Sequence, residues 1–184
     1  LPHRREPTQY KVKENKMNPK TLHQISYGLY VIAARKDDKI NGQIANTVFQ
    51  ITSKPPTLAV SINKENYTHE FIKEGRSLAV NVLDRDTGMV FIGRFGFKCG
   101  RDIDKFDGVK YRLSPLGNPI LEENSTAFLE VRVDKEVDVG THTIFIGEVV
   151  DADILSDGEP LTYAHYHLVK KGKAPKTAPT YIEE

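Results

Sequence analysis

Apolar and polar residues alternate along most of the middle of the chain. Leu58, Val60 and Ile62 alternate with small or polar side chains, so one face of this extended segment is apolar. The same period of two recurs twice further along, and a later stretch is rich in Ile, Val and Phe, which favour strands. The predicted strands are residues 30–34, 43–52, 58–63, 78–82, 127–133 and 143–155.

Two short helices are expected between these strands. The first is capped by Thr68 and ends before Gly75, and the second begins at Asp86 or Thr87 and ends within Gly93–Gly96. Neither is long enough to be stable alone, so both are expected to pack on the sheet. Many strands, short connections and few helices favour an antiparallel barrel over a doubly wound parallel sheet.

Length and charge narrow the class of protein. A chain of 184 residues is expected to form one domain of ordinary size. The net charge is +3 over residues 1–16, +2 over residues 169–184 and −4 over the patterned part between them. A domain that binds nucleic acid normally carries a basic surface on its folded part, so no nucleic-acid partner is predicted.

The ends of the chain and its apolar content suggest a location. No apolar stretch is long enough to span a bilayer, and residues 1–16 lack the apolar middle of a signal peptide. We therefore expect a cytoplasmic protein with no membrane contact. Residues 1–16 are interpreted as an added leader or a disordered arm, residues 17–169 as the domain, and residues 170–184 as a polar, linker-like tail.

Several motifs are absent, which excludes some classes of site. The chain contains no P-loop, no H-E-x-x-H and no G-x-S-x-G. His165 and His167 would share one face of a strand, but edge or solvated histidines are the favoured interpretation, and no metal site is predicted. Cys99, the one cysteine, excludes an internal disulfide, and no partner for its thiol is identifiable.

One candidate ligand segment is residues 41–50, which are unusually polar for a strand. If it is extended, Asn46 and Gln50 share a face with Ile44 and Val48, whereas Thr47 lies on the other face. A buried amide without a partner costs about 1–3 kcal/mol, and a planar heterocycle would supply partners. The alternative, a polar outer face of an amphipathic strand, is favoured from this segment alone.

Two further segments have the residues of a ligand site. Residues 61–69 leave an apolar strand and enter a helix, and amides at a helix start together with Asn63, Lys64 and Thr68 suit a phosphate monoester. Residues 140–148 place His142 at the start of a strand after a glycine turn, which would be the rim of a barrel. Glu148 shares its face by parity. Taken alone, residues 61–69 are better explained as turn and cap residues, and His142 could equally be a hydrogen-bonded structural residue.

Taken together, and in the order in which they follow one another along the chain, these segments resemble the flavin reductase family of FMN-binding split-barrel proteins. The likeness is greatest to the archaeal ferric reductases and to the flavin reductase halves of rubredoxin-linked oxidoreductases. It covers roughly residues 20–173. The segments that carry it are Ile25–Tyr30, Gly42–Gln50, Asn63–Asn66, Phe91–Phe97, Lys105–Val109, Val139–Thr143 and Tyr166–Gly172.

The resemblance implies a mainly β, antiparallel Greek-key split barrel with a few short flanking helices. It also implies a homodimer that binds FMN near the subunit interface. By position, the residues assigned to the flavin ring and ribityl chain are Gln43, Ala45, Asn46 and Thr47, with Ser61 lining the pocket. Those assigned to the phosphate are Asn63, Lys64, Thr68 and, with less support, His69.

The remaining assigned residues surround the cofactor. Phe95 and Lys105 would flank it, and Tyr166 and Lys170, from an expected C-terminal strand, would close the site or reach the other subunit. His142 would lie near the isoalloxazine as the catalytic residue. Close relatives implied by the resemblance carry a cysteine where this chain has Ser61, so a mechanism that needs that thiol is not supported.

The implied chemistry is hydride transfer from NADH or NADPH to FMN, followed by electron delivery to a ferric complex, free flavin or a small redox protein. Two alternatives remain open. One is an FMN electron carrier that is reduced by a protein partner and does not bind nicotinamide. The other is a flavin-binding module without turnover.

Overall fold

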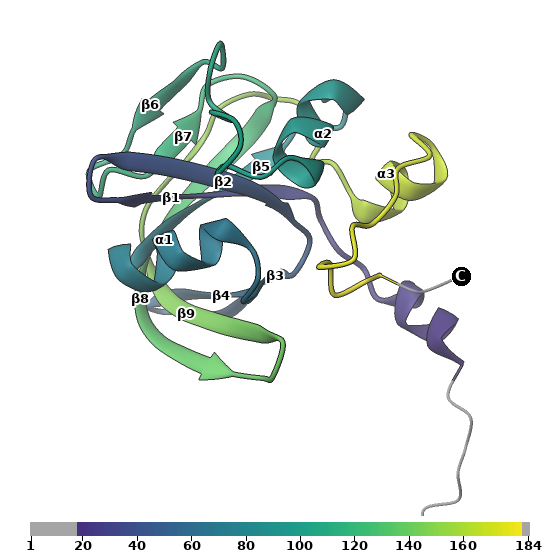
Figure 1. The fold of residues 1–184 in the computed structure, drawn as a ribbon, viewed down its shortest axis with the longest axis horizontal. Helices are drawn as coiled ribbons and strands as arrows, with labels where there is room; N and C mark the ends of the chain where they lie inside the picture. The colour runs from purple at the N-terminus through teal and green to yellow at the C-terminus, as the bar shows by residue number, and fades with distance from the viewer. Residues whose placement is uncertain (1–17, 182–184) are drawn as a thin grey trace, which may run out of the picture.

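A single large antiparallel sheet forms the body of the protein in the computed structural model, which describes residues 18–181 (Figure 1). Its strand order is β2-β1-β5-β8-β9-β4-β3, and a separate hairpin pairs β6 with β7. The strands are β1 (Tyr30–Lys36), β2 (Lys39–Ala45), β3 (Val48–Ser53), β4 (Pro56–Asn63), β5 (Ser77–Leu83), β6 (Tyr111–Leu113), β7 (Pro119–Leu121), β8 (Ser125–Asp138) and β9 (His142–Ile154).

The described part of the chain contains few helices, and they are short. They are η1 (Pro19–Gln24), a 3₁₀ helix, and the α-helices α1 (Tyr67–Gly75), α2 (Met89–Phe97) and α3 (Tyr163–Leu168). A large antiparallel sheet with few helices confirms the predicted mainly β class. None of the helices described over residues 18–181 is long and apolar enough to cross a membrane.

The sheet curls around a first cluster of buried side chains, the inner core. Ile32 of β1 belongs to this cluster together with Val60 of β4 and Phe145 of β9, although β5 and β8 separate β1 from those two strands in the sheet. Phe71 and Ile72 of α1 join the same cluster, so α1 fills the space that the curled sheet leaves between its two halves (Figure 1).

β1 is buried on both faces. Ile32 and Ala34 belong to the inner core, whereas Val31 and Ala33 belong to a second cluster, the outer core. The outer core adds Phe95 of α2 and the aromatic rings of α3. A strand covered on both faces needs a continuous apolar run, which explains why residues 31–34 do not alternate.

The predicted strand at residues 43–52 is wrong in one respect, because it is two strands. β2 ends at Ala45 and β3 begins at Val48, and these two strands lie at opposite edges of the sheet. Asn46 and Thr47 make the crossing. Thr47 donates its hydroxyl proton to Asn46 Oδ1 at 3.0 Å, and its carbonyl accepts from the Ser61 amide. The parity argument across this segment therefore fails.

The predicted helix ends shift by a few residues. Asn66, not Thr68, precedes the first turn of α1, and Thr68 lies inside the helix. Gly75 is the last helical residue, and Arg76 takes the left-handed conformation that ends it (φ 52°). α2 begins later than expected, at Met89, because residues 84–87 form a turn in which the Asp84 carbonyl accepts from the Thr87 amide.

The expected C-terminal strand is wrong, because this segment is a helix. Residues 163–168 form α3, which Thr162 caps by accepting from the His165 amide at 3.1 Å. His165 and His167 therefore do not share a strand face. The predicted leader, residues 1–16, lies outside the described residues.

Candidate functional site

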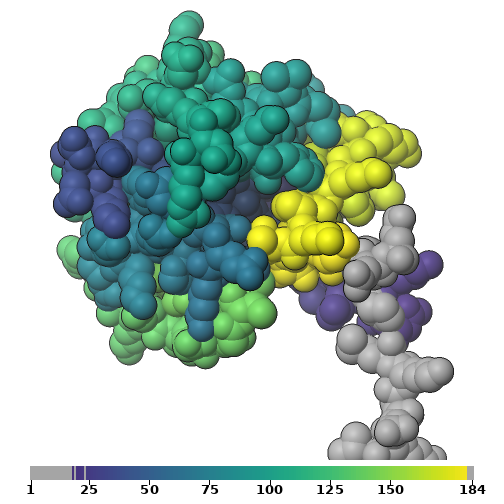
Figure 2. Space-filling view, in the orientation of Figure 1, coloured from purple at the N-terminus to yellow at the C-terminus, as the bar shows by residue number. Residues whose placement is uncertain are grey.

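A cavity of about 370 Å³ opens where the end of β2, the end of β4, α2 and α3 approach one another. A further side is the C-terminal segment, residues 173–180, which lies against these elements as a surface strip (yellow in Figure 2). Phe95, Phe97, Tyr67, Tyr163 and Tyr166 give it apolar and aromatic walls. Ligand pockets combine such walls with a few placed polar groups.

Most residues assigned by resemblance meet at this cavity. They come from five elements and two loops that are distant in sequence, so the fold brings them together. The assigned residues that line the cavity are Gln43, Ala45, Asn46, Ser61, Asn63, Thr68, Phe95, Lys105 and Tyr166. The other five, Thr47, Lys64, His69, His142 and Lys170, are not part of its lining.

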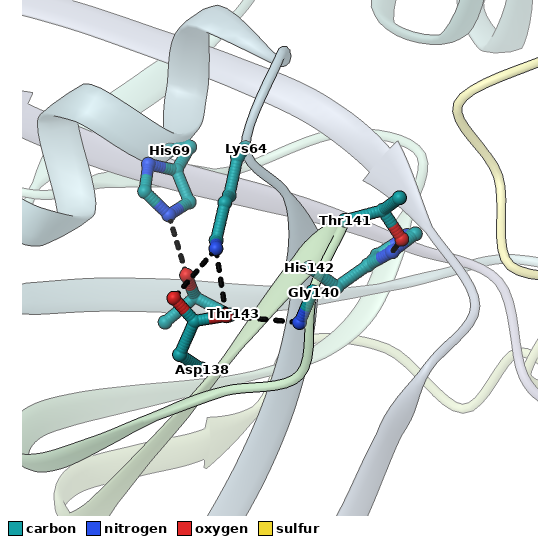
Figure 3. A network of polar contacts seen from close by, with 7 residues as sticks. All are labelled: Lys64, His69, Asp138, Gly140, Thr141, His142 and Thr143. Carbon is teal, nitrogen blue, oxygen red and sulfur yellow. Dashed lines mark hydrogen bonds and ion pairs between the residues drawn. The ribbon is translucent and has the colours of Figure 1, made fainter.

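Lys64 and His69 belong instead to a polar network on the far side of the β4–α1 turn (Figure 3). Lys64 Nζ lies 2.6 Å from Asp138 Oδ2, and this pairing lowers the pKa of the Asp138 carboxyl. His69 Nε2 lies 2.8 Å from Thr143 Oγ1, and burial lowers the pKa of this imidazole. Both side chains have protein partners, so neither is positioned here for a phosphate.

His142 begins β9 opposite Asn63, its register partner in β4. Its Nδ1 lies 2.8 Å from Thr141 Oγ1, on the side of β9 away from Lys64 (Figure 3). Its Nε2 is buried and has no hydrogen-bond partner within 3.5 Å among the described residues. Burial lowers the pKa of His142, and a weak interaction with the Thr177 backbone acts in the opposite direction. The ring is therefore neutral at pH 7.

The remaining two residues outside the lining have local roles. Thr47 bonds Asn46 in the crossing between β2 and β3. The Lys170 amide donates to the His165 carbonyl at the end of α3. Glu148, whose role was left open, pairs with Arg132 of the neighbouring strand at 2.9 Å.

Gln43 places an unpaired polar atom at the cavity. Its Nε2 makes one long hydrogen bond of 3.4 Å to the Ile44 carbonyl, and its Oε1 is buried without a hydrogen-bond partner among residues 18–181. The side chain lines the cavity. Because a buried acceptor without a donor costs about 1–3 kcal/mol, a ligand with an N–H group would be stabilised here. The neighbouring Asn41, by contrast, donates to Thr68 Oγ1 at 2.9 Å.

Lys105 is a buried cation in the wall of the cavity. Its Nζ donates to the carbonyls of Gly42 at 2.8 Å and Phe95 at 3.1 Å. Burial lowers the pKa of Lys105 to about 8, an effect that nearby Cys99 opposes. An ammonium has three donors, so one proton remains for a third acceptor.

The charges around the cavity favour an anionic ligand. Four lysines line it, Lys98, Lys105, Lys173 and Lys176, against one carboxylate, Glu65. A low-dielectric cleft lined by one sign of charge attracts the opposite charge. Among residues 18–181, no group of three His, Cys, Asp or Glu side chains could hold a metal ion.

Sequence reasoning missed part of this lining. Asn41, Lys98, Cys99 and Tyr163 line the cavity together with residues 173–180. Residues 173–180 were expected as a linker, yet Thr180 is buried there and bonds both Asn46 and Tyr163. Two threonines in this otherwise basic segment were the available signal, and they do not specify a partner.

Comparison with known proteins decides the family. The chain matches the model described as a flavin reductase like domain over residues 22–172. It belongs to the flavin reductase-like family. A ferric-chelate reductase (NAD(P)H) of Archaeoglobus fulgidus is 52% identical over 167 residues, which cover 91% of this chain and 99% of that protein. A high molecular weight rubredoxin of Moorella thermoacetica is 57% identical over 165 residues, covering 90% and 72%.

Solved structures of family members agree with the fold. The crystal structure of the flavin reductase HpaC complexed with NADP⁺ superimposes with a TM-score of 0.66 at 26% identity, covering 76% of this chain and 86% of that one. The resemblance to ferric reductases and rubredoxin-linked proteins is therefore confirmed. The cavity fits the family's flavin in chemistry: an unpaired acceptor at Gln43, aromatic walls and an excess of lysines.

Proposed function

We propose that this chain is an FMN-dependent NAD(P)H oxidoreductase of the flavin and ferric reductase type. The observation that carries the proposal is the unpaired Gln43 oxygen in a cavity built by the residues that the family resemblance assigns to the flavin. A relative named ferric-chelate reductase (NAD(P)H), similar over 99% of its length, supports the same activity.

The residues of the cavity have separable roles in this proposal. Gln43 Oε1 accepts a hydrogen bond from the ring, and Ala45, Asn46 and Ser61 form the adjoining wall. Asn63 and Thr68 lie toward the phosphate end. FMN, when bound, supplies the group that accepts a hydride and releases electrons. Phe95 and Tyr166 exclude water from the cavity, and the buried Lys105 ammonium holds positive charge beside it.

The proposal extends to the electron acceptor, the electron donor and the oligomeric state. A ferric complex, free flavin or a small redox protein takes the electrons, and either NADH or NADPH supplies them. The Moorella relative, named a rubredoxin, favours the second candidate function, an FMN electron carrier reduced by a protein partner. We also propose a cytoplasmic homodimer, consistent with the apolar side chains Phe49 and Ile51, which are exposed on the edge strand β3.

An absorbance spectrum with added FMN, followed by anaerobic mixing with NADH and with NADPH, tests the function. Rapid loss of the oxidised flavin band with one nicotinamide supports the reductase. Slow loss with both, together with fast reduction by a reduced protein donor, supports the carrier. Folded protein that takes up no FMN in equilibrium dialysis contradicts both.

The Gln43→Leu variant tests the observation that carries the proposal. Leu has nearly the same size but offers no acceptor, so we expect FMN affinity to fall by about tenfold, the effect of one lost hydrogen bond of ordinary strength. Gln50→Leu is the matched control, because Gln50 is exposed on β3 and bonds only the Thr52 carbonyl. Equal FMN affinity in both variants would remove Gln43 from the site.

A further inference from the structure

The C-terminal segment at residues 173–180, here called the strap, is bonded to the cavity at three points. Tyr166 donates its hydroxyl proton to the Lys173 carbonyl at 2.9 Å. Asn63 Nδ2 donates to the Thr177 carbonyl at 3.3 Å. At the far end, Asn46 Nδ2 donates to Thr180 Oγ1 at 3.0 Å, and that hydroxyl donates to the Tyr163 oxygen at 3.0 Å.

The strap is a wall of the cavity and not a plug. It contributes all its residues to the lining, and about 370 Å³ remains beside it. This volume lies in the range of small-molecule sites, roughly 300–1,000 Å³. The strap in its present position therefore leaves room for a ligand and faces it along one side.

The phosphate end of the site needs a cation, and Lys64 is not available for it. Lys64 is paired with Asp138 outside the cavity. Lys105 donates two of its three protons to the backbone carbonyls of Gly42 and Phe95. Lys98, which follows α2, is the remaining lysine of the domain body in the lining. The phosphate end in this proposal is the end near Asn63.

Lys176 of the strap lies at that end. It precedes Thr177, whose carbonyl is bonded to Asn63, and it lines the cavity with an exposed side chain. Lys176 makes no ion pair with any residue in the range 18–181. Lys173 also lines the cavity, but its backbone is fixed at the other end, against Tyr166 of α3.

We propose that the strap is a specificity element of the flavin site, in which Lys176 recognises the terminal phosphate and so selects FMN over unphosphorylated flavin. The inference rests on the proposed flavin-binding function and assigns the phosphate contact to a residue that sequence reasoning placed in a linker. The Asn46–Thr180–Tyr163 bonds hold the strap so that Lys176 faces the cavity.

The test compares the affinity of two flavins that differ only by the phosphate. Wild type, Lys176→Gln and Lys173→Gln are titrated with FMN and with riboflavin by isothermal calorimetry. A charge-assisted contact to phosphate predicts that Lys176→Gln weakens FMN binding by about tenfold and leaves riboflavin binding unchanged. Lys173→Gln, the matched control on the same strap, weakens FMN binding less.

A second measurement follows the strap itself. Trypsin cleaves after lysine, so FMN bound to Lys176 is expected to protect the 176–177 bond more than riboflavin at equal occupancy does. Thr180→Val removes the bonds to Asn46 and Tyr163, and we expect it to increase cleavage of the strap and to weaken both flavins.

The outcomes separate the two proposals. If wild type binds neither flavin, the proposed function fails. If wild type binds FMN but Lys176→Gln binds it equally well, or loses riboflavin to the same degree, the phosphate assignment is overturned while the function stands. If Lys173→Gln has the larger effect, the phosphate lies at the α3 end and the proposal is likewise wrong.

Discussion

Lys105 is the residue whose ionisation is most disturbed by its surroundings. Its pKa of about 8, against an ordinary 10.5, means that the folded chain binds this proton less tightly than the unfolded chain does. Between pH 8 and 10.5 the unfolded state therefore holds more protons, and the free energy of unfolding rises with pH. The contribution is about 3 kcal/mol across the window, and below pH 8 the full penalty of the buried charge is present.

We predict that Lys105→Met abolishes this rise. Urea denaturation at pH 7.5 and pH 10 gives the free energy of unfolding, and the difference between wild type and variant is the measured quantity. We expect the free energy of unfolding of wild type to rise relative to that of the variant as the pH increases. Lys98→Met, which removes an exposed lysine of the same cavity, is the control. A constant difference between wild type and Lys105→Met would contradict the assigned pKa.

His142 is predicted to act on nicotinamide oxidation more than on flavin binding. Because burial keeps its ring neutral at pH 7, it offers a donor or an acceptor without adding charge. We expect His142→Ala to slow flavin reduction by NAD(P)H at least about tenfold, the size of a lost positioning contact, with less effect on FMN affinity. Thr141→Val removes the contact at Nδ1 but keeps the ring. If the rate of flavin reduction in stopped-flow measurements is unchanged in His142→Ala, His142 has no role in nicotinamide oxidation.

Side-chain pairing across long sequence distances limited what could be predicted at this scale. Lys64 has the type and position of a phosphate ligand, but its partner Asp138 lies 74 residues away, and no local pattern reveals that pairing. Gln43 was assigned to the flavin through the family resemblance, and it lies in the lining of the cavity. Thr180 was not, because its partners Asn46 and Tyr163 come from two other elements.

At the scale of elements, α1 and α2 offer a matched pair of glycines. A Cβ on Gly75, at the end of α1, would lie 2.2 Å from the Arg35 carbonyl oxygen of β1, whereas one on Gly93 in α2 has nothing within 4 Å. Gly75→Ala therefore forces α1 off the sheet and is expected to cost about 2 kcal/mol or more. Gly93→Ala is expected to stabilise by about 0.5–1 kcal/mol through helix propensity.

Denaturant unfolding of the two glycine variants checks this pair. The expected signs are opposite, so a general effect of added methyl groups cannot explain both. Two variants of equal stability would show that α1 can move away from β1 without cost, which the burial of Phe71 and Ile72 in the inner core argues against.

The element types were predictable from periodicity, and the failures have physical causes. Alternation found β4, β5 and β8, since each buries one face or both, and a composition rich in Ile, Val and Phe found β9. It missed the crossing at Asn46 and Thr47, because a change of sheet edge leaves no gap in the β-favouring composition. The segment that contains His165 and His167 was expected as a strand, whereas a capping bond from Thr162 starts a helix there.

At the scale of the whole molecule, we propose that copies associate through the edge strand β3. Phe49 and Ile51 are exposed there, at 54% and 45%. Uncovered edge strands with apolar side chains are sites of association. We predict a homodimer that Phe49→Asp weakens at least about tenfold in its dissociation constant, as expected when a charge replaces an apolar contact at an interface. Sedimentation equilibrium measures it.

The control for the association experiment is Val90→Asp. Val90 is 85% exposed, on α2 and not on β3. This variant should sediment as wild type does. Equal association of wild type and Phe49→Asp would move the interface away from β3, and a wild type that sediments as a monomer would contradict the dimer.

The burial of β1 on both faces gives this protein an internal reporter of ligand occupancy. Its central amides exchange with solvent only when the whole domain opens, because each face is covered by a separate core. A ligand held only by the folded state slows such openings in proportion to its saturation. Deuterium uptake along β1 therefore yields a binding isotherm for colourless nicotinamides and coloured flavins alike.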